Sequence, residues 1–308
     1  MNKNLLILGA SSLQLALIKK SKELGFNTIV LDLNPSAPSA LIADEFYPIS
    51  TVDTEKVFEL ARNKEIVGIL TTSDFPVRVV AFVAEQLGLT GPSIHVAEIC
   101  TNKALQRDFL KKESFLHPKF KNIKAKSELD SVKGWDFPLI VKPVDSSASR
   151  GVQKVSSMNE LVDAYEYALT SSRSGDVIVE EFIVGKEYSV EALVQNGETY
   201  IIAITEKLTT GENGNFFVEE VHVVPATLQY EQKKQIETTV AKFINALGFN
   251  NSAAHVEVMV NSQGVYIIEI AARLGGIISQ AILFHLRRAW ICSRQLFQLV
   301  LEKELSLK

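Results

Sequence analysis

Two short apolar runs separated by an amphipathic segment open the chain, and this pattern constrains the fold more than any other feature. Residues 5–8 (LLIL) and 28–31 (TIVL) are typical of strands that are buried on both faces. Residues 13–24 carry apolar side chains at helical spacing and stop at Gly25, which predicts a helix with a glycine cap. Such a βαβ unit has parallel strands and a right-handed crossover.

The same alternation continues along the first third of the chain. Helices are predicted over 54–63 and 76–87, and short strands over 66–71 and 89–92. Alternating strands and helices indicate a doubly wound α/β sheet, so we place a Rossmann-like domain at residues 1–99. A helix over 94–112 is expected to follow it.

Residues 100–308 have a different pattern, in which strands follow one another and some pair as hairpins. We therefore expect an α+β second domain there. The Gly-containing stretch 207–216 is polar and is expected to form a long functional loop. Predicted strands lie at 138–142, 150–155, 176–182, 187–194, 199–205, 254–260 and 265–270, and predicted helices at 157–170, 230–247 and 280–303.

Composition and charge exclude several classes of protein. Hydrophobic residues make up 46% and charged residues 22%, which is ordinary for a globular protein. The net charge of −4 shows none of the cationic surplus of a nucleic-acid-binding domain. Cys100 and Cys292 form no CxxC pair, and no apolar stretch is long enough to span a membrane. We expect a cytoplasmic protein that binds neither nucleic acid nor membrane.

The strongest local signal is a pair of acidic residues inside neighbouring apolar strands. Glu257 and Glu269 lie in HVEVMV and YIIEIAARLGG, which a short turn at Asn261–Gly264 joins. Pairing around that turn could bring both carboxylates to one face. Buried like charges about 4 Å apart repel by several kcal/mol, so the pair would share a proton or hold a hard cation such as magnesium. Arg273 could then balance phosphate charge.

Two other segments have polar residues beside apolar strands. Lys142 ends an apolar strand and is followed by the hydroxyl-rich loop DSSASRG, which could cover phosphates with backbone N–H groups or could be a plain polar turn. Glu180 and Glu181 interrupt the next strand and point to opposite faces. They could line a nucleotide pocket or be solvated charges at a strand edge.

Other polar features give weaker signals. Residues 9–14 (GASSLQ) lack the second and third glycines of a dinucleotide fingerprint, so a tight scaffold turn is the favoured interpretation. Lys103, at the start of a helix, carries no signal alone and is compatible with a surface position. His222 and His255 lie in strands, where a lone histidine is more often hydrogen-bonded than a ligand.

Taken in order, these pieces resemble the ATP-grasp superfamily. The order is Lys103, LIVKP, EEFI with GKEYSVE, HVEV and EIAARLGG, preceded by a segment similar to a pre-ATP-grasp domain. The resemblance implies a pre-ATP-grasp domain at 1–99, an ATP-grasp domain at 100–308 and a small lid subdomain at about 115–182. Within the superfamily, ITEKLTTGENGNFFVEEVHVVPA with EIAARLGG is similar to L-amino-acid (carboxylate–amine) ligases and to carbamoyl-phosphate-synthase-like members.

The resemblance assigns a role to each site residue. Lys103 and Lys142 would contact the ATP phosphates, and Glu187 would hold the ribose. Glu180 and the backbone of Phe182 and Ile183 would contact the adenine. Glu257 and Glu269 would bind Mg²⁺ or Mn²⁺, and Lys142 and Arg273 would be catalytic. The nucleotide-binding set is Lys103, Lys142, Ser147, Ser149, Gly151, Glu180, Glu181, Phe182, Ile183, Glu187, Glu257 and Glu269.

The resemblance implies an ATP-dependent ligase that activates a carboxylate as an acyl phosphate and joins it to an amine. Phosphorylation of bicarbonate or carbamate, and nucleotide binding without ligase activity, stay open as alternatives. Two departures matter: Ala271 stands where many members have Asn, and Ala148 where glycine is frequent. The segment 285–294 is unlike the expected continuation. The sequence names neither substrate and leaves a monomer or a homodimer open.

Overall fold

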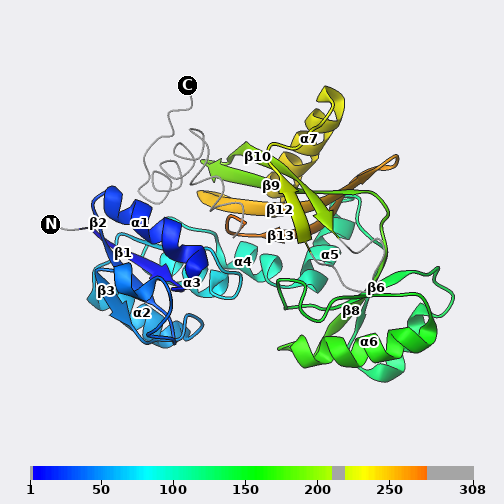
Figure 1. Cartoon of the computed structure of the whole chain (residues 1–308), viewed down its shortest axis with the longest axis horizontal. Coiled ribbons are helices and arrows are strands. Elements are labelled where there is room, and N and C mark those ends of the chain that lie inside the picture. The colour runs from blue at the N-terminus through cyan, green and yellow to red at the C-terminus, as the bar shows by residue number, and fades with distance from the viewer. Residues whose placement is uncertain (1–2, 210–218, 276–308) are drawn as a thin grey trace.

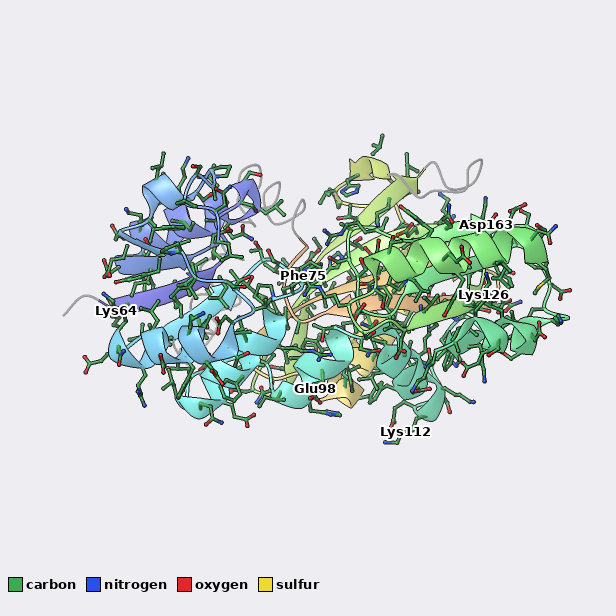
Figure 2. All side chains as sticks on the ribbon, turned by 90° about the horizontal axis from the view of Figure 1, so that it is seen from below. Lys64, Phe75, Glu98, Lys112, Lys126 and Asp163 are labelled. Atoms are coloured by element: carbon green, nitrogen blue, oxygen red, sulfur yellow. The ribbon has the colours of Figure 1, made fainter. Side chains whose placement is uncertain are left out.

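A computed structural model describes residues 3–209 and 219–275. The strands of this part form three sheets, two with four strands and one with five. Figure 1 shows the N-terminal sheet at one end of the molecule and the sheet that contains β6 (Leu139–Pro143) and β8 (Val177–Glu181) at the other end, with helix α4 (Ile94–Cys100) between them. In Figure 2, Lys64 marks the N-terminal part, Lys126 and Asp163 mark the far end, and Phe75 lies between them.

The N-terminal sheet is parallel, as the βαβ pattern predicts. Its order is β3 (Glu45–Tyr47), β2 (Phe26–Leu31), β1 (Lys3–Leu8) and β4 (Gly68–Thr71). Alternate residues of β1 enter two separate cores, because successive side chains point to opposite faces. Helix α1 (Leu15–Glu23) packs on one face, and α2 (Thr54–Asn63) and α3 (Val77–Gln86) pack on the other.

The helix predicted over 94–112 is in fact two helices, which corrects that expectation. Helix α4 (Ile94–Cys100) ends before Asn102, and α5 (Lys103–Lys112) begins after it. Asn102 is extended, and its side chain accepts hydrogen bonds from the N–H groups of Ala104 and Leu105. The break makes Lys103 the first residue of a new helix. No strand forms at 89–92, which is also a correction within the part of the chain that is described.

The second four-stranded sheet has the order β5 (Phe120–Ile123), β8 (Val177–Glu181), β6 (Leu139–Pro143) and β7 (Gln153–Val155). Helix α6 (Met158–Ser171) buries its apolar side against it. We call this unit the lid sheet. The predicted strand 150–155 is shorter than expected because Ala148, Ser149 and Gly151 have φ values of 56°, 53° and 76°, which interrupt extended backbone.

The five-stranded sheet is antiparallel, and we call it the main sheet. Its order is β11 (Glu219–Val223), β10 (Glu198–Thr209), β9 (Lys186–Gln195), β12 (Ser252–Asn261) and β13 (Gly264–Ala271). Helix α7 (Tyr230–Leu247) covers one face and ends at Gly248, which is left-handed.

One boundary of the main sheet corrects the sequence analysis. Strand β10 continues to Thr209, so Lys207 belongs to a strand and not to the loop predicted over 207–216. Residues 210–218 of that loop, and the predicted helix 280–303, lie outside the described residues. Within the described ranges, no helix combines the length and apolar character that a membrane span requires.

Candidate functional site

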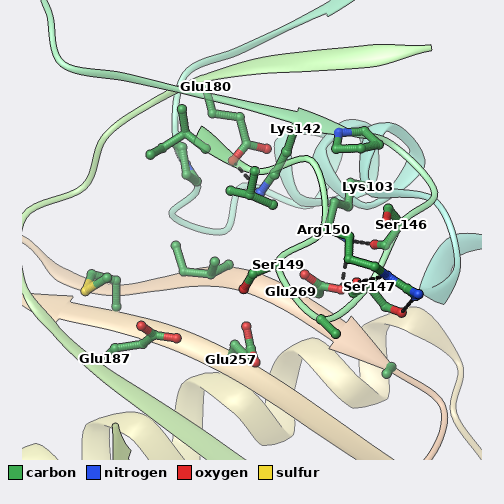
Figure 3. Close-up of a pocket in the computed structure, with 18 of the residues that line it drawn as sticks. Lys103, Lys142, Ser146, Ser147, Ser149, Arg150, Glu180, Glu187, Glu257 and Glu269 are labelled. Carbon is green, nitrogen blue, oxygen red and sulfur yellow. Dashed lines mark hydrogen bonds and ion pairs between the residues drawn. The ribbon is translucent and has the colours of Figure 1, made fainter. Parts of the chain in front are cut away.

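The lid sheet and the main sheet form two walls of a pocket of about 200 Å³ (Figure 3). The lid sheet contributes residues from β6 and β8 and from the loop between β6 and β7. The main sheet contributes residues from β9, β10, β12 and β13, and α5 contributes Lys103. Twelve predicted site residues line this pocket: Lys103, Lys142, Ser147, Ser149, Glu180, Glu181, Phe182, Ile183, Glu187, Glu257, Glu269 and Arg273.

Glu257 and Glu269 are direct partners in the antiparallel pairing of β12 with β13, as the hairpin prediction requires. Both carboxylates face the pocket in Figure 3. Each has a lysine counter-ion: Lys207 Nζ lies 3.0 Å from Glu257 Oε1, and Lys103 Nζ lies 2.9 Å from Glu269 Oε1. Burial would raise the pKa of Glu257, but Lys207 and His255 outweigh it and hold that pKa well below its usual value. Glu257 is therefore held in its ionised form at the pocket wall.

Lys207 is a site residue that the sequence analysis missed. Its Nζ lies 2.6 Å from Glu187 Oε1 as well as 3.0 Å from Glu257, and its side chain is only 4% exposed. The residue was counted with the polar loop that follows it, where a lysine carries no signal. The signal that could have found it is the alternation of the preceding strand, which places Thr205 and Lys207 on one face.

Glu180 is buried in the lid wall between two cations. Lys142 Nζ lies 2.8 Å from Glu180 Oε2, and Arg107 Nε lies 2.8 Å from Glu180 Oε1. Burial would raise the pKa of Glu180, but the two cations lower it to about 2. Burial also lowers the pKa of Lys142, and Glu180 opposes that effect. Arg107, from α5, did not figure in the sequence analysis.

The loop between β6 and β7 is held by its own backbone and by α5. Lys103 Nζ donates a hydrogen bond of 2.7 Å to the carbonyl of Ser146, so this lysine is buried and not a surface residue. Arg150 donates to the carbonyl of Ser147. Gly151 does not line the pocket: its Cα lies so close to Pro143 and Ser171 that a Cβ would be 2.8 and 2.9 Å from them.

These arrangements match known proteins. A model of the ATP-grasp domain matches residues 135–281, which include β6, β7 and β8 of the lid sheet, the main sheet and both acidic residues of the hairpin. The crystal structure of L-amino acid ligase from Bacillus licheniformis superimposes with a TM-score of 0.81 at 25% identity, over 99% of this chain and 75% of that one. Residues 135–281 therefore carry an ATP-grasp domain.

Curated proteins that are similar to this chain include ligases. Alanine–anticapsin ligase of Bacillus subtilis (strain 168) is 28% identical over 73% of this chain and 52% of its own length. Formate-dependent phosphoribosylglycinamide formyltransferase of Bacteroides thetaiotaomicron is 28% identical over 88% of this chain and 70% of its own length. The chain spans about half the length of several curated relatives that it matches.

The pocket has two further features on the main-sheet side. Arg273 lines the pocket, and its Nε donates a 2.7 Å hydrogen bond to Asp74, which follows β4 in the N-terminal part. His255 contacts Glu191 through Nδ1 at 2.6 Å. Burial would lower the pKa of His255, but Glu191 outweighs it and raises that pKa to about 9. The strand histidine is thus hydrogen-bonded within the protein, as expected.

Proposed function

We propose that this protein is a Mg²⁺-ATP-dependent ligase that joins a carboxylate to an amine. One observation carries the proposal. The paired carboxylates of Glu257 and Glu269 lie on one wall of the pocket, and the ammonium groups of Lys103 and Lys142 also face it. Hard cations take carboxylate oxygens as ligands, and ammonium groups bind phosphate oxygens. A nucleotide triphosphate with a divalent cation needs both kinds of group.

The residues present fit a magnesium ion. Magnesium is commonly bound through one or two carboxylates together with phosphate oxygens and water. Glu257 and Glu269 supply the two carboxylates, and the apolar side chain of Ala271 supplies no further ligand. When bound, the ion would neutralise phosphate charge, and the Lys207 and Lys103 contacts keep both carboxylates in position.

In this proposal, different pocket residues bind different parts of the nucleotide. Lys103 and Lys142 hold phosphate oxygens, the loop with Ser147 and Ser149 excludes water, and Glu187 binds the ribose. The adenine lies against Glu180, Glu181 and the backbone of Phe182 and Ile183. Gly151 keeps the loop close to α6 and does not contact the nucleotide. Each assignment rests on position in the pocket and on the ATP-grasp resemblance.

In the proposed reaction, a carboxylate oxygen attacks the γ-phosphorus, the bond to the β-phosphate oxygen breaks, and ADP leaves. The amine then attacks the acyl carbon, phosphate leaves, and the amine loses a proton. Arg273 would stabilise the transferred phosphoryl group. Asp74 orients Arg273 from the N-terminal part, which supports our proposal that residues 1–99 form a pre-ATP-grasp domain beside the reacting groups.

A second candidate is nucleotide binding without ligase activity. Lysines already neutralise both carboxylates, and Ala271 supplies no third ligand, so this candidate expects weak metal binding. It predicts that ATP binds and that no carboxylate or amine stimulates ADP release.

The deciding experiment measures phosphate release with magnesium and ATP against a panel of amino acids, small dicarboxylates and bicarbonate. We expect an amino acid pair to stimulate release, and Glu269→Gln to abolish that stimulation. Stimulation by bicarbonate alone would indicate carboxyphosphate chemistry instead. ATP binding without stimulation by any member of the panel would contradict the ligase proposal.

A further inference from the structure

Arg107 is a buried cation that lies behind the pocket and does not line it. It is 0% exposed, and the pocket reaches Lys142 and Glu180 but not Arg107 among the described residues. A ligand can therefore contact the two other members of this charge cluster without contacting Arg107. A fully buried cation is costly unless it is paired, so its position calls for a physical reason.

The guanidinium of Arg107 connects the two walls of the pocket. Its Nε lies 2.8 Å from Glu180 Oε1, and its Nη2 donates to Glu180 Oε2 at 3.1 Å. The same Nη2 donates a 2.7 Å hydrogen bond to the carbonyl of Ile268, in β13 of the main sheet. Arginine can do this because its planar fork offers several donors, whereas a lysine offers one point charge.

Helix α5 determines where Arg107 lies relative to the two sheets. Lys103 and Arg107 are four residues apart, so they share one side of the helix and reach different carboxylates, Glu269 and Glu180. Between them Gln106 anchors the helix to β13: its side chain accepts a hydrogen bond from the N–H of Ile270 and donates one to the Ile270 carbonyl. The helix is thus held on the main sheet while Arg107 reaches the lid sheet.

Glu180 has two cations for one negative charge, and they differ in what else they can reach. Lys142 and Glu180 lie on adjacent strands, β6 and β8, where Lys142 pairs with Ile178 and Glu180 with Ile140, so the two are diagonal neighbours. Lys142 Nζ lies 2.8 Å from Glu180 Oε2 and faces the pocket. If Lys142 turned to a phosphate and Arg107 were absent, a buried carboxylate would be left without a counter-ion, which is strongly unfavourable.

We propose that Arg107 is a positioning residue that remains paired with Glu180 and thereby releases Lys142 to the phosphates of a bound nucleotide. The inference rests on the proposed function, because it assumes that phosphates enter this pocket. It adds a residue that never touches the nucleotide but sets how much of the binding free energy comes from the phosphate groups.

The test compares the dissociation constants of ATP and adenosine, measured by calorimetry with magnesium present. The dissociation constant of adenosine divided by that of ATP gives the affinity that the phosphates contribute. We expect Arg107→Met to reduce this ratio at least about tenfold, because Lys142 must then stay with Glu180. Lys112→Met removes an exposed cation from the last turn of the same helix and should leave the ratio unchanged.

A double variant separates the charge effect from a loss of packing. In Arg107→Met with Glu180→Gln, no carboxylate retains Lys142, so we expect the ratio to return to within about threefold of the wild type. A contact between Glu180 and the adenine affects both dissociation constants and cancels in the ratio. If Arg107→Met does not fold, Arg107→Lys should lower the ratio by a smaller factor, because it keeps the charge and loses the fork.

The outcomes also distinguish the two proposals. A wild-type protein that binds ATP no more tightly than adenosine contradicts the proposed function itself. A wild-type protein that prefers ATP, with a ratio that Arg107→Met leaves unchanged, contradicts only the inference on Arg107. Equal weakening of ATP and adenosine in the variant would indicate a merely structural arginine and would also overturn it.

Discussion

The lid sheet and the main sheet face the same pocket with opposite arrangements of charge. In the lid wall, one carboxylate, Glu180, is buried between Lys142 and Arg107. In the main wall, Lys207 lies between two carboxylates, Glu187 and Glu257. An excess of cations suits phosphate oxygens, and an excess of carboxylates suits a divalent cation. Mutating one wall at a time should therefore separate binding of the triphosphate from binding of the metal.

The largest expected effect separates chemistry from binding in the main wall. Glu257→Gln removes one charge of the carboxylate pair, so we expect substrate-stimulated ADP release to fall about 1000-fold, while the affinity for adenosine changes little. Glu198→Gln, at an exposed position in the same sheet, is the matched control. Turnover that survives in Glu257→Gln would show that the proposed metal site does not need both carboxylates.

The lid wall should show its charge excess as a dependence of stability on pH. The pKa of Glu180 is lowered from 4.5 to about 2, so its contribution to the free energy of unfolding is complete above about pH 4.5 and is lost as the pH falls through 2. The shift corresponds to about 3 kcal/mol. The free energies of unfolding of the wild type and of Glu180→Gln, measured with urea, should differ by about 3 kcal/mol at neutral pH and become equal in acid. A pH-independent difference would contradict the assignment.

Removing the central lysine of the main wall should create a dependence on magnesium. Lys207→Met leaves the carboxylates of Glu187 and Glu257 without their shared cation, so we expect a loss of about 2 kcal/mol in the free energy of unfolding. Magnesium should restore most of it, because the ion can replace the lost charge. Thermal unfolding with and without magnesium measures this. Arg107→Met should gain no such rescue, since the pocket does not reach that position.

The smallest expected effect concerns the segment that connects the two walls. A Cβ on Gly185 would lie 2.6 Å from the carbonyl oxygen of Val260 and 3.0 Å from Met259 Cγ, so Gly185→Ala must displace the β8–β9 connection. We expect a loss of about 1–2 kcal/mol in stability. Val184→Ala, at the exposed neighbouring residue, should be close to neutral. Equal stability of both variants would show that this contact is not a constraint.

The two walls also differ in how far the sequence predicted them. The hairpin of β12 and β13 is local, because a short turn joins two apolar strands and fixes which residues oppose each other. The pairing of Glu257 with Glu269 could therefore be predicted. The end of strand β10 could not be distinguished from the polar stretch that follows it, so Lys207 was assigned to a loop. The apolar periodicity continues on both sides of Asn102, so the range 94–112 did not show that the helix is interrupted there, although Lys103 was placed at the start of a helix.

The amino-acid sequence was sufficient to predict the parallel N-terminal sheet, the antiparallel hairpins and the order of pocket residues along the chain. These depend on apolar periodicity and on turns between neighbours. Which charged side chains pair with each other in the pocket became visible only in the folded structure. Arg107 meets Glu180 across 73 residues, and Arg273 meets Asp74 across 199. The physical reason is that an ion pair depends on distance and burial between packed elements, and no local pattern in the sequence records which elements come together.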